Sequence, residues 1–201
     1  MKRLVVCMTG ATGAVYGVKL LEALAGLGVQ THLVLSKWAK VTLHEETPYD
    51  LDYVHGLATR VFSDRDQAAP ISSGSFRHDG VAIVPCSMKT LAGIRAGYAD
   101  NLILRAADVA LKEGRRLVLM VRETPLSVIH LDNMLAVARA GAVIFPAMPA
   151  FYHRPNTLDD VVNQSVGRLL DLFDHEMPGL PRWDGLAGSD GHPSSRNGVE
   201  P

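Results

Sequence analysis

The chain of 201 residues is 47% hydrophobic and 20% charged, a composition that suits one globular domain with a sizeable core and excludes an intrinsically disordered protein. The formal net charge of −1 gives no electrostatic reason to expect nucleic acid or an anionic membrane as a partner. No apolar run reaches the ~18 residues of a membrane-spanning helix, and the run after Arg3 is too short for a secretory signal, so we expect a cytoplasmic protein.

The N-terminal segment predicts a strand, a glycine turn and a helix. Residues 3–8 form a short apolar run, residues 9–14 read Thr-Gly-Ala-Thr-Gly-Ala, and apolar residues then recur every third position from 15 to 24. The glycines allow backbone N–H groups to approach a phosphate at the start of the helix. The spacing is G-x-x-G rather than G-x-G-x-x-G, so the dinucleotide fingerprint does not apply. The turn alone fits either a phosphate site or an ordinary tight connection.

The rest of the chain predicts strands that alternate with helices. Residues 49–80 are weakly patterned, so we expect only short elements and a surface loop there. Continuous apolar strands separated by helices indicate an α/β fold with a parallel sheet covered on both faces, in a single domain over residues 1–184. Residues 185–201 are rich in glycine, serine and proline and predict a disordered tail. Strands are expected at 30–35, 81–85, 116–121 and 142–145, and helices at 38–46, 88–96, 101–113, 127–140 and 157–173.

The cysteines and histidines predict no metal site. Cys7 and Cys86 have no C-x-x-C spacing, so we expect a reduced pair rather than a disulfide or a metal centre. His44-Glu45-Glu46 is not the zinc motif H-E-x-x-H, and His130 and His153 lack partners at ligand spacing.

Polar residues gather after the predicted strands, and in an open parallel sheet a ligand binds beyond the carboxyl ends of the strands. The set is rich in hydroxyl groups and includes Arg122-Glu123 and Tyr152. It suits a phosphate-bearing cofactor, with Arg122 meeting a phosphate or a polarised carbonyl. Structural explanations remain open for each: Ser87 and Thr90 as helix caps, Arg122-Glu123 as a solvated pair, and Tyr152 as part of the core.

Six segments, taken in order, resemble the UbiX/Pad1 flavin prenyltransferases. The resemblance covers residues 1–183, including Pro181-Arg-Trp183, and implies a Rossmann-like, doubly wound flavoprotein. It also implies that reduced FMN is a substrate, and that the dimethylallyl group of dimethylallyl phosphate is joined to flavin N5 and C6 without a metal. The segments are Thr9-Gly-Ala-Thr-Gly-Ala-Val-Tyr-Gly17, Pro85-Cys-Ser-Met-Lys-Thr-Leu91, Arg105–Glu113, Val121-Arg-Glu-Thr-Pro125, His130-Leu-Asp-Asn-Met134 and Pro149-Ala-Phe-Tyr-His-Arg-Pro155.

The resemblance further implies partners and an assembly. The product, prenylated FMN, is the cofactor of UbiD-type decarboxylases, either in ubiquinone biosynthesis or in aromatic acid breakdown. The resemblance also implies a homododecamer with its sites at subunit contacts.

Roles for single residues follow from the resemblance by position. Glu46 would take the protons lost at flavin N5 and C6, Glu123 would exchange protons with the departing phosphate, and Arg122 would meet the flavin. Arginine and lysine would offset the growing charge of the leaving group, and an aromatic wall of Trp183, Tyr152 and Phe151 would keep water away from the allylic cation. The FMN residues are Gly10, Ala11, Thr12 (serine in many relatives), Ser36, Ser87, Met88, Lys89, Thr90 and Arg122; the prenyl phosphate residues are Tyr152, Arg168, Arg105 and Lys112.

Two other functions remain compatible with the sequence. A flavin-dependent cysteine decarboxylase of the same superfamily would carry a catalytic histidine near the first helix and a P-A-S-A-N-T-like loop, where this chain has Tyr16-Gly17 and Pro85–Thr90. A non-catalytic FMN carrier would share most of the FMN-binding residues, so the sequence separates it poorly from the enzyme.

Overall fold

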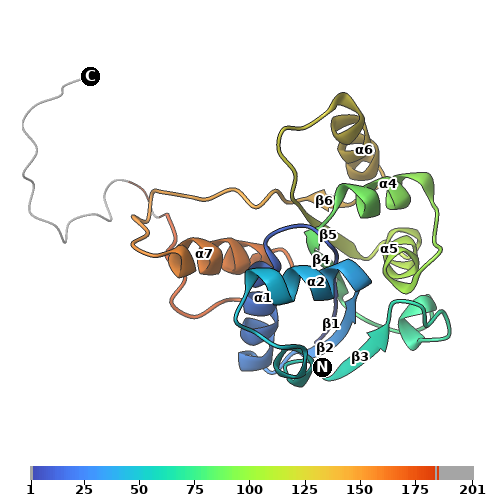
Figure 1. Ribbon diagram of the computed structural model, residues 1–201, viewed down its shortest axis with the longest axis horizontal. Helices are drawn as coiled ribbons and strands as arrows, with labels where there is room; N and C mark the ends of the chain where they lie inside the picture. The colour runs from blue at the N-terminus through green and yellow to red at the C-terminus, as the bar shows by residue number, and fades with distance from the viewer. Residues whose placement is uncertain (1, 184, 186–201) are drawn as a thin grey trace, which may run out of the picture.

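The structure, a computed structural model, describes residues 2–183 and 185. Its centre is a six-stranded parallel sheet (Figure 1). The strand order is β3-β2-β1-β4-β5-β6, which is the order of a Rossmann-type doubly wound sheet. The predicted α/β class and the parallel sheet are therefore confirmed. The strands are β1 (Arg3–Met8), β2 (Gln30–Leu35), β3 (Arg60–Ser63), β4 (Gly80–Cys86), β5 (Arg116–Val121) and β6 (Val143–Ile144).

Helices cover both faces of the sheet. One apolar cluster joins the sheet to α1, α2, α3 and α7, and a second joins it to α4, α5, α6 and the short 3₁₀ turn η1. In Figure 1, α7 lies beside α1, while α4, α5 and α6 lie on the other side of the sheet. The helices are α1 (Ala14–Gly26), α2 (Lys37–Glu46), α3 (Leu51–Gly56), α4 (Met88–Ala96), α5 (Leu102–Lys112), α6 (Val128–Arg139) and α7 (Leu158–Asp171), and η1 is Pro70–Ser72.

The central strand β1 supplies both clusters because successive side chains of a strand point to opposite faces. Leu4, Val6 and Met8 belong to the first cluster, whereas Val5 and Cys7 belong to the second. All five side chains are fully buried. The continuous apolar run that predicted this strand thus reflects burial on both faces.

The first helix lies close against the sheet because it carries glycine at position 17. A Cβ on Gly17 would lie 2.6 Å from Met8 Cε and 2.6 Å from the carbonyl oxygen of Val84. The close approach places the start of α1, and with it the glycine turn, directly at the end of β1.

The predicted elements are all present, with small shifts at their ends, and the structure adds β3 and α3. The sequence did not predict β3 because this edge strand buries only Phe62 and so shows no apolar pattern. Residues 184 and 186–201, and with them nearly all of the predicted tail, lie outside the described residues.

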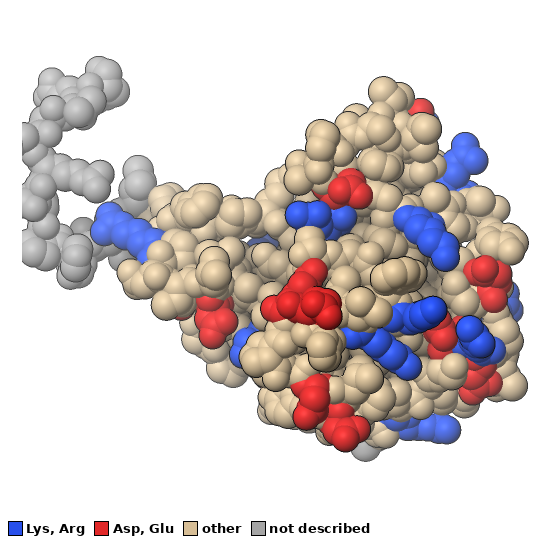
Figure 2. Space-filling view, in the orientation of Figure 1, with Lys and Arg blue, Asp and Glu red and all other residues tan. Residues whose placement is uncertain are grey.

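Neither the surface charge nor the hydropathy of the described residues points to a particular class of binding partner. Lysine and arginine are interspersed with aspartate and glutamate on the face shown in Figure 2. None of the helices that the structure describes is both long and apolar enough to cross a membrane. Cys7 and Cys86 are both buried free thiols.

Candidate functional site

Three capped helices begin at the carboxyl edge of the sheet, and their first turns line one cavity of about 220 Å³. Ser36, Ser87 and Asn101 cap α2, α4 and α5, each accepting a hydrogen bond from the backbone N–H three residues later. Because the N-terminus of a helix carries partial positive charge, the cavity is suited to an anion. Its lining consists of Thr9, Gly10, Ser36, Lys37, Trp38, Asp64, Ser87, Lys89, Thr90, Asn101, Ile103 and Leu104.

Thr9 connects the ends of β1 and β4 beneath this cavity. Its Oγ1 donates to the carbonyl oxygen of Pro85 at 2.8 Å and accepts from the backbone N–H of Ser87 at 2.8 Å. The side chain is only 2% exposed. Ser87 Oγ in turn lies 3.1 Å from Thr90 Oγ1. Ser87 therefore caps α4, whereas the Thr90 hydroxyl contacts Ser87 and does not cap the helix, and both residues line the cavity.

The glycine turn lies against the first turn of α2. A Cβ on Gly10 would overlap the Cβ of Trp38, so only glycine allows the turn to lie there. The Trp38 side chain is 64% exposed although it lines the cavity. Trp38 could not be predicted as a site residue, since an aromatic residue in the first turn of a helix carries no distinctive signal in the sequence.

A carboxylate occupies the N-terminus of α1. The N-cap of α1 is Gly13, which has no side chain to cap the helix, and Glu46 at the end of α2 takes its place. Glu46 Oε2 accepts hydrogen bonds from Gly13 N at 2.7 Å and from Ala14 N at 3.1 Å. A phosphate at this helix end would be repelled by the carboxylate. The first N–H groups of α1 are thus bound to a carboxylate, and the anion cavity lies beside this turn.

Arg122 and Glu123 lie next to this region, directly after β5. The neighbouring strand end is close because Cys86 pairs with Val121, and Arg122 N donates to the carbonyl oxygen of Cys86 at 3.3 Å. Both side chains are exposed. Within the described part of the chain, Arg122 and Glu123 form no ion pair with each other, and Glu123 Oε1 accepts from Thr124 N at 3.1 Å.

A second group of predicted residues lies on α7 and the segments beside it. The rings of Tyr152 and Trp183 meet edge-on with centroids 5.9 Å apart. Arg168 on α7 forms an ion pair with Asp171 at 2.7 Å, and Arg182 pairs with the same carboxylate. The Arg182 guanidinium is the larger cause that lowers the pKa of Asp171.

The packing of α7 against α1 connects the second group to the cavity region. Tyr16, in the first turn of α1, packs against the apolar cluster that includes α7, and its hydroxyl lies near Ser165 in the middle of that helix. Burial raises the pKa of Tyr16, and the contact with Ser165 acts in the opposite direction. The middle of α7 therefore lies beside the start of α1, where Glu46 binds.

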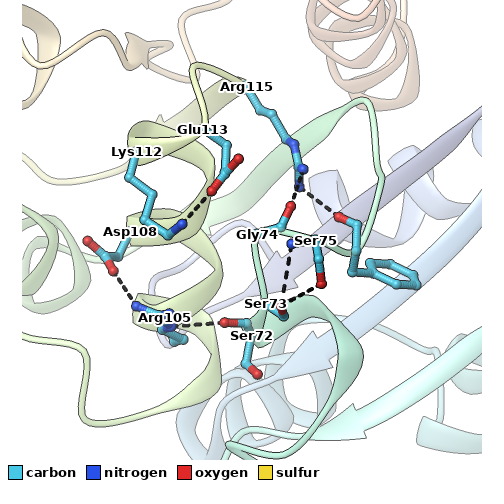
Figure 3. A network of polar contacts seen from close by, with 10 residues as sticks. Ser72, Ser73, Gly74, Ser75, Arg105, Asp108, Lys112, Glu113 and Arg115 are labelled. Atoms are coloured by element: carbon cyan, nitrogen blue, oxygen red, sulfur yellow. Dashed lines mark hydrogen bonds and ion pairs between the residues drawn. The ribbon is translucent and has the colours of Figure 1, made fainter.

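Arg105 and Lys112, both on α5, form a third group, and neither of them lines the cavity. Arg105 donates to the carbonyl oxygen of Ser72 at 3.0 Å and pairs with Asp108 at 2.7 Å, while Lys112 pairs with Glu113 (Figure 3). Helix α5 starts at the carboxyl edge, where Leu102 N donates to the backbone carbonyl oxygen of Asp64. It ends just before β5 begins. Lys112 thus lies at the amino-terminal edge, opposite the cavity.

Other features of the described residues offer weaker candidates. A larger cavity of about 550 Å³ lies between α2 and α3, but it contains no residue from a strand end. No group of three histidine, cysteine, aspartate or glutamate side chains is arranged to hold a metal ion in the part of the chain that the structure describes.

Comparisons with known proteins agree over most of the chain. A family model described as "Flavoprotein" matches residues 1–170. A protein of Escherichia coli O157:H7 named "Probable UbiX-like flavin prenyltransferase" is 59% identical over 196 residues, which are 97% of this chain and 96% of that protein.

Two solved structures are similar over nearly their full length. The crystal structure of AnUbiX (PadA1) in complex with FMN and dimethylallyl pyrophosphate has a TM-score of 0.91 and 60% identity, covering 92% of this chain and 98% of that one. The crystal structure of a dodecameric FMN-dependent UbiX-like decarboxylase from Escherichia coli O157:H7 has a TM-score of 0.89 and 60% identity, covering 91% of this chain and 100% of that one.

The anion cavity can be tested by comparing two serine caps. Ser87→Ala removes the cap of α4 inside the cavity, and Ser127→Ala removes the equivalent cap of α6, which does not line it. Each change is expected to cost about 1 kcal/mol of unfolding free energy. Only Ser87→Ala is expected to reduce the rise in melting temperature that inorganic phosphate produces. An equal phosphate effect in both variants would place the anion elsewhere.

Proposed function

The chain belongs to the Flavoprotein family and, within it, to the UbiX/Pad1 flavin prenyltransferases, and on that premise we propose that it joins the dimethylallyl group of dimethylallyl phosphate to N5 and C6 of reduced FMN. The observation that carries the proposal is the cavity at the carboxyl edge, where α2, α4 and α5 begin and serine and threonine hydroxyls converge. The reaction makes the protein a transferase, with FMN as a substrate that leaves as prenylated FMN.

The phosphate of FMN is assigned to this cavity. Ser36, Ser87 and Thr90 would bind its oxygens through their hydroxyls and the N–H groups at the helix starts. Support comes from the short contacts that already fix Pro85 and Ser87 on Thr9. Gly10, Ala11, Thr12, Met88 and Lys89 would complete the flavin contacts, and Arg122 would meet the ring.

Glu46 and Glu123 are assigned to proton transfer. Both hydrogen bonds from the start of α1 fall on Glu46 Oε2, so Oε1 is left without a partner among the described residues. That oxygen would take the protons lost at flavin N5 and C6. Glu123 lies beyond the end of β5 and would donate a proton to the phosphate as the carbon–oxygen bond breaks.

The prenyl phosphate is assigned to the second group of residues. Tyr152 and Arg168 would bind the phosphate, and the edge-on pair of Tyr152 and Trp183 would form part of the aromatic wall, with Phe151 beside it. Positive charge on arginine offsets the charge that develops on the leaving phosphate. No metal is needed in this scheme.

Lys112 is assigned to a site in a neighbouring subunit, because it lies at the opposite edge of its own sheet. Arg105 is assigned with it, because it lies on the same helix and does not line the cavity. An assembly is supported by apolar side chains that a single chain leaves exposed, among them Val128, Ile129 and Phe151. A similar solved structure is dodecameric. We therefore propose a homododecamer with sites at subunit contacts.

A UbiD-type decarboxylase is the proposed recipient of prenylated FMN, and we place the protein in the cytoplasm, where its two free thiols would stay reduced. The cysteine decarboxylase alternative is disfavoured because Tyr16-Gly17 and Pro85–Thr90 replace that group's histidine and loop. The non-catalytic FMN carrier is separated from the enzyme by the first experiment below.

Anaerobic incubation of the protein with reduced FMN and dimethylallyl phosphate tests the function directly. Mass spectrometry is expected to show flavin with a five-carbon group added and one equivalent of phosphate released, with or without EDTA. Recovery of unmodified FMN only would contradict the prenyltransferase function and favour a non-catalytic FMN carrier. Turnover that EDTA abolishes and Mg²⁺ restores would contradict a metal-free reaction.

The two carboxylates are expected to fail at different steps. Glu46→Gln should release phosphate and attach the prenyl group once, then stall before ring closure, because the base for the C6 proton is missing. Glu123→Gln should slow phosphate release itself. Rapid mixing with optical detection and a phosphate assay separates the two steps. The control is Glu45→Gln, a change at the exposed residue next to Glu46, which should behave as wild type. Blocked phosphate release in Glu46→Gln would reverse the two roles.

A further inference from the structure

The side chain of Tyr152 is held from three directions. Its ring meets Trp183 edge-on with centroids 5.9 Å apart and meets His153 edge-on at 5.5 Å. Its hydroxyl oxygen accepts a hydrogen bond from Gln164 Nε2 at 3.1 Å. The aromatic contacts fix the plane of the ring, and Gln164 fixes the hydroxyl group. Although 45% of Tyr152 is exposed, it is therefore constrained in orientation.

Gln164 is a polar residue on the buried side of α7. It is 5% exposed and lies in a stretch of α7, Val162–Gly167, in which every position except Asn163 is buried. A buried amide without a partner costs free energy, so its presence here calls for a specific contact. The Tyr152 hydroxyl is the side-chain partner that the described structure gives it.

The direction of this hydrogen bond determines what Tyr152 can do. A tyrosine hydroxyl has one proton to donate and lone pairs that accept. Since Gln164 donates to the oxygen, the proton of Tyr152 is not used in this contact and remains for another acceptor. Arg168 follows Gln164 by four residues and so lies one helical turn further along the same side of α7. A hydroxyl donor and a guanidinium near each other suit a phosphate.

We propose that Gln164 is a positioning residue, whose buried amide holds the Tyr152 hydroxyl so that its proton points to an oxygen of the prenyl phosphate. The inference rests on the proposed function, in which Tyr152 and Arg168 bind that phosphate. Gln164 itself does not touch the substrate. It acts through Tyr152, so its effect is on the binding of the prenyl donor and not on the binding of FMN.

Calorimetry with dimethylallyl phosphate and protein holding oxidised FMN measures this effect without turnover, because only reduced FMN is a substrate. Gln164→Met keeps the size of the side chain and removes the donor, so the Kd is expected to rise about tenfold. Tyr152→Phe should weaken binding to a similar degree, and adding Gln164→Met to it should change the Kd by less than about twofold. Asn163→Leu is the matched control on α7 and should bind as wild type.

Two further readouts separate positioning from a general loss of structure. All variants should bind FMN as tightly as wild type. With reduced FMN, Gln164→Met should raise KM for the prenyl donor about tenfold while kcat changes less than about threefold.

Wild-type affinity in Gln164→Met, or losses that multiply in the double variant, would overturn the role of Gln164 while leaving the proposed function intact. A wild-type protein that binds no dimethylallyl phosphate and forms no prenylated FMN would overturn the proposed function, and this role with it.

Discussion

The bond between the Glu46 carboxylate and the start of α1 is the contact on which the arrangement of the site depends. Gly13 leaves the first N–H groups of α1 uncapped, and Glu46 reaches back from the last turn of α2 to accept two of them. The bond holds α2 over the glycine turn. It also places negative charge where a G-x-x-G turn would otherwise attract a phosphate. The neighbouring cavity, where three other helices begin, is left as the place for an anion.

The sheet topology explains why this cavity exists. The strand order reverses at β1, which lies between β2 and β4, so the connections after β1 and β4 leave toward opposite faces of the sheet. A crevice at the carboxyl ends of the strands is the expected result. Thr9 spans the base of this crevice and fixes the backbone of Ser87. The ends of β1 and β4, which belong to the buried core, thereby orient the hydroxyl groups that line the site.

The sequence predicted the elements that are buried on both sides and the hydroxyl groups that follow them. Strands such as β4 show a continuous apolar run, whereas β3 buries only Phe62 and left no pattern. The bond from Glu46 to α1 could not be predicted, because residues 38–46 indicate a helix but not where its last turn lies. The position of Lys112 was equally hidden, since the direction of α5 relative to the sheet appears only in the fold. Gln164 was visible as a polar residue in an apolar helix, but its partner was not.

The most direct test is a crystal structure of the protein with FMN bound, in which the position of the phosphate is measured. The account predicts that the phosphate oxygens lie within hydrogen-bond distance of Ser36, Ser87 and Thr90, and that Glu46 keeps its two bonds to Gly13 and Ala14. A phosphate bound to the N–H groups of Gly13 and Ala14, with Glu46 displaced from the start of α1, would contradict it.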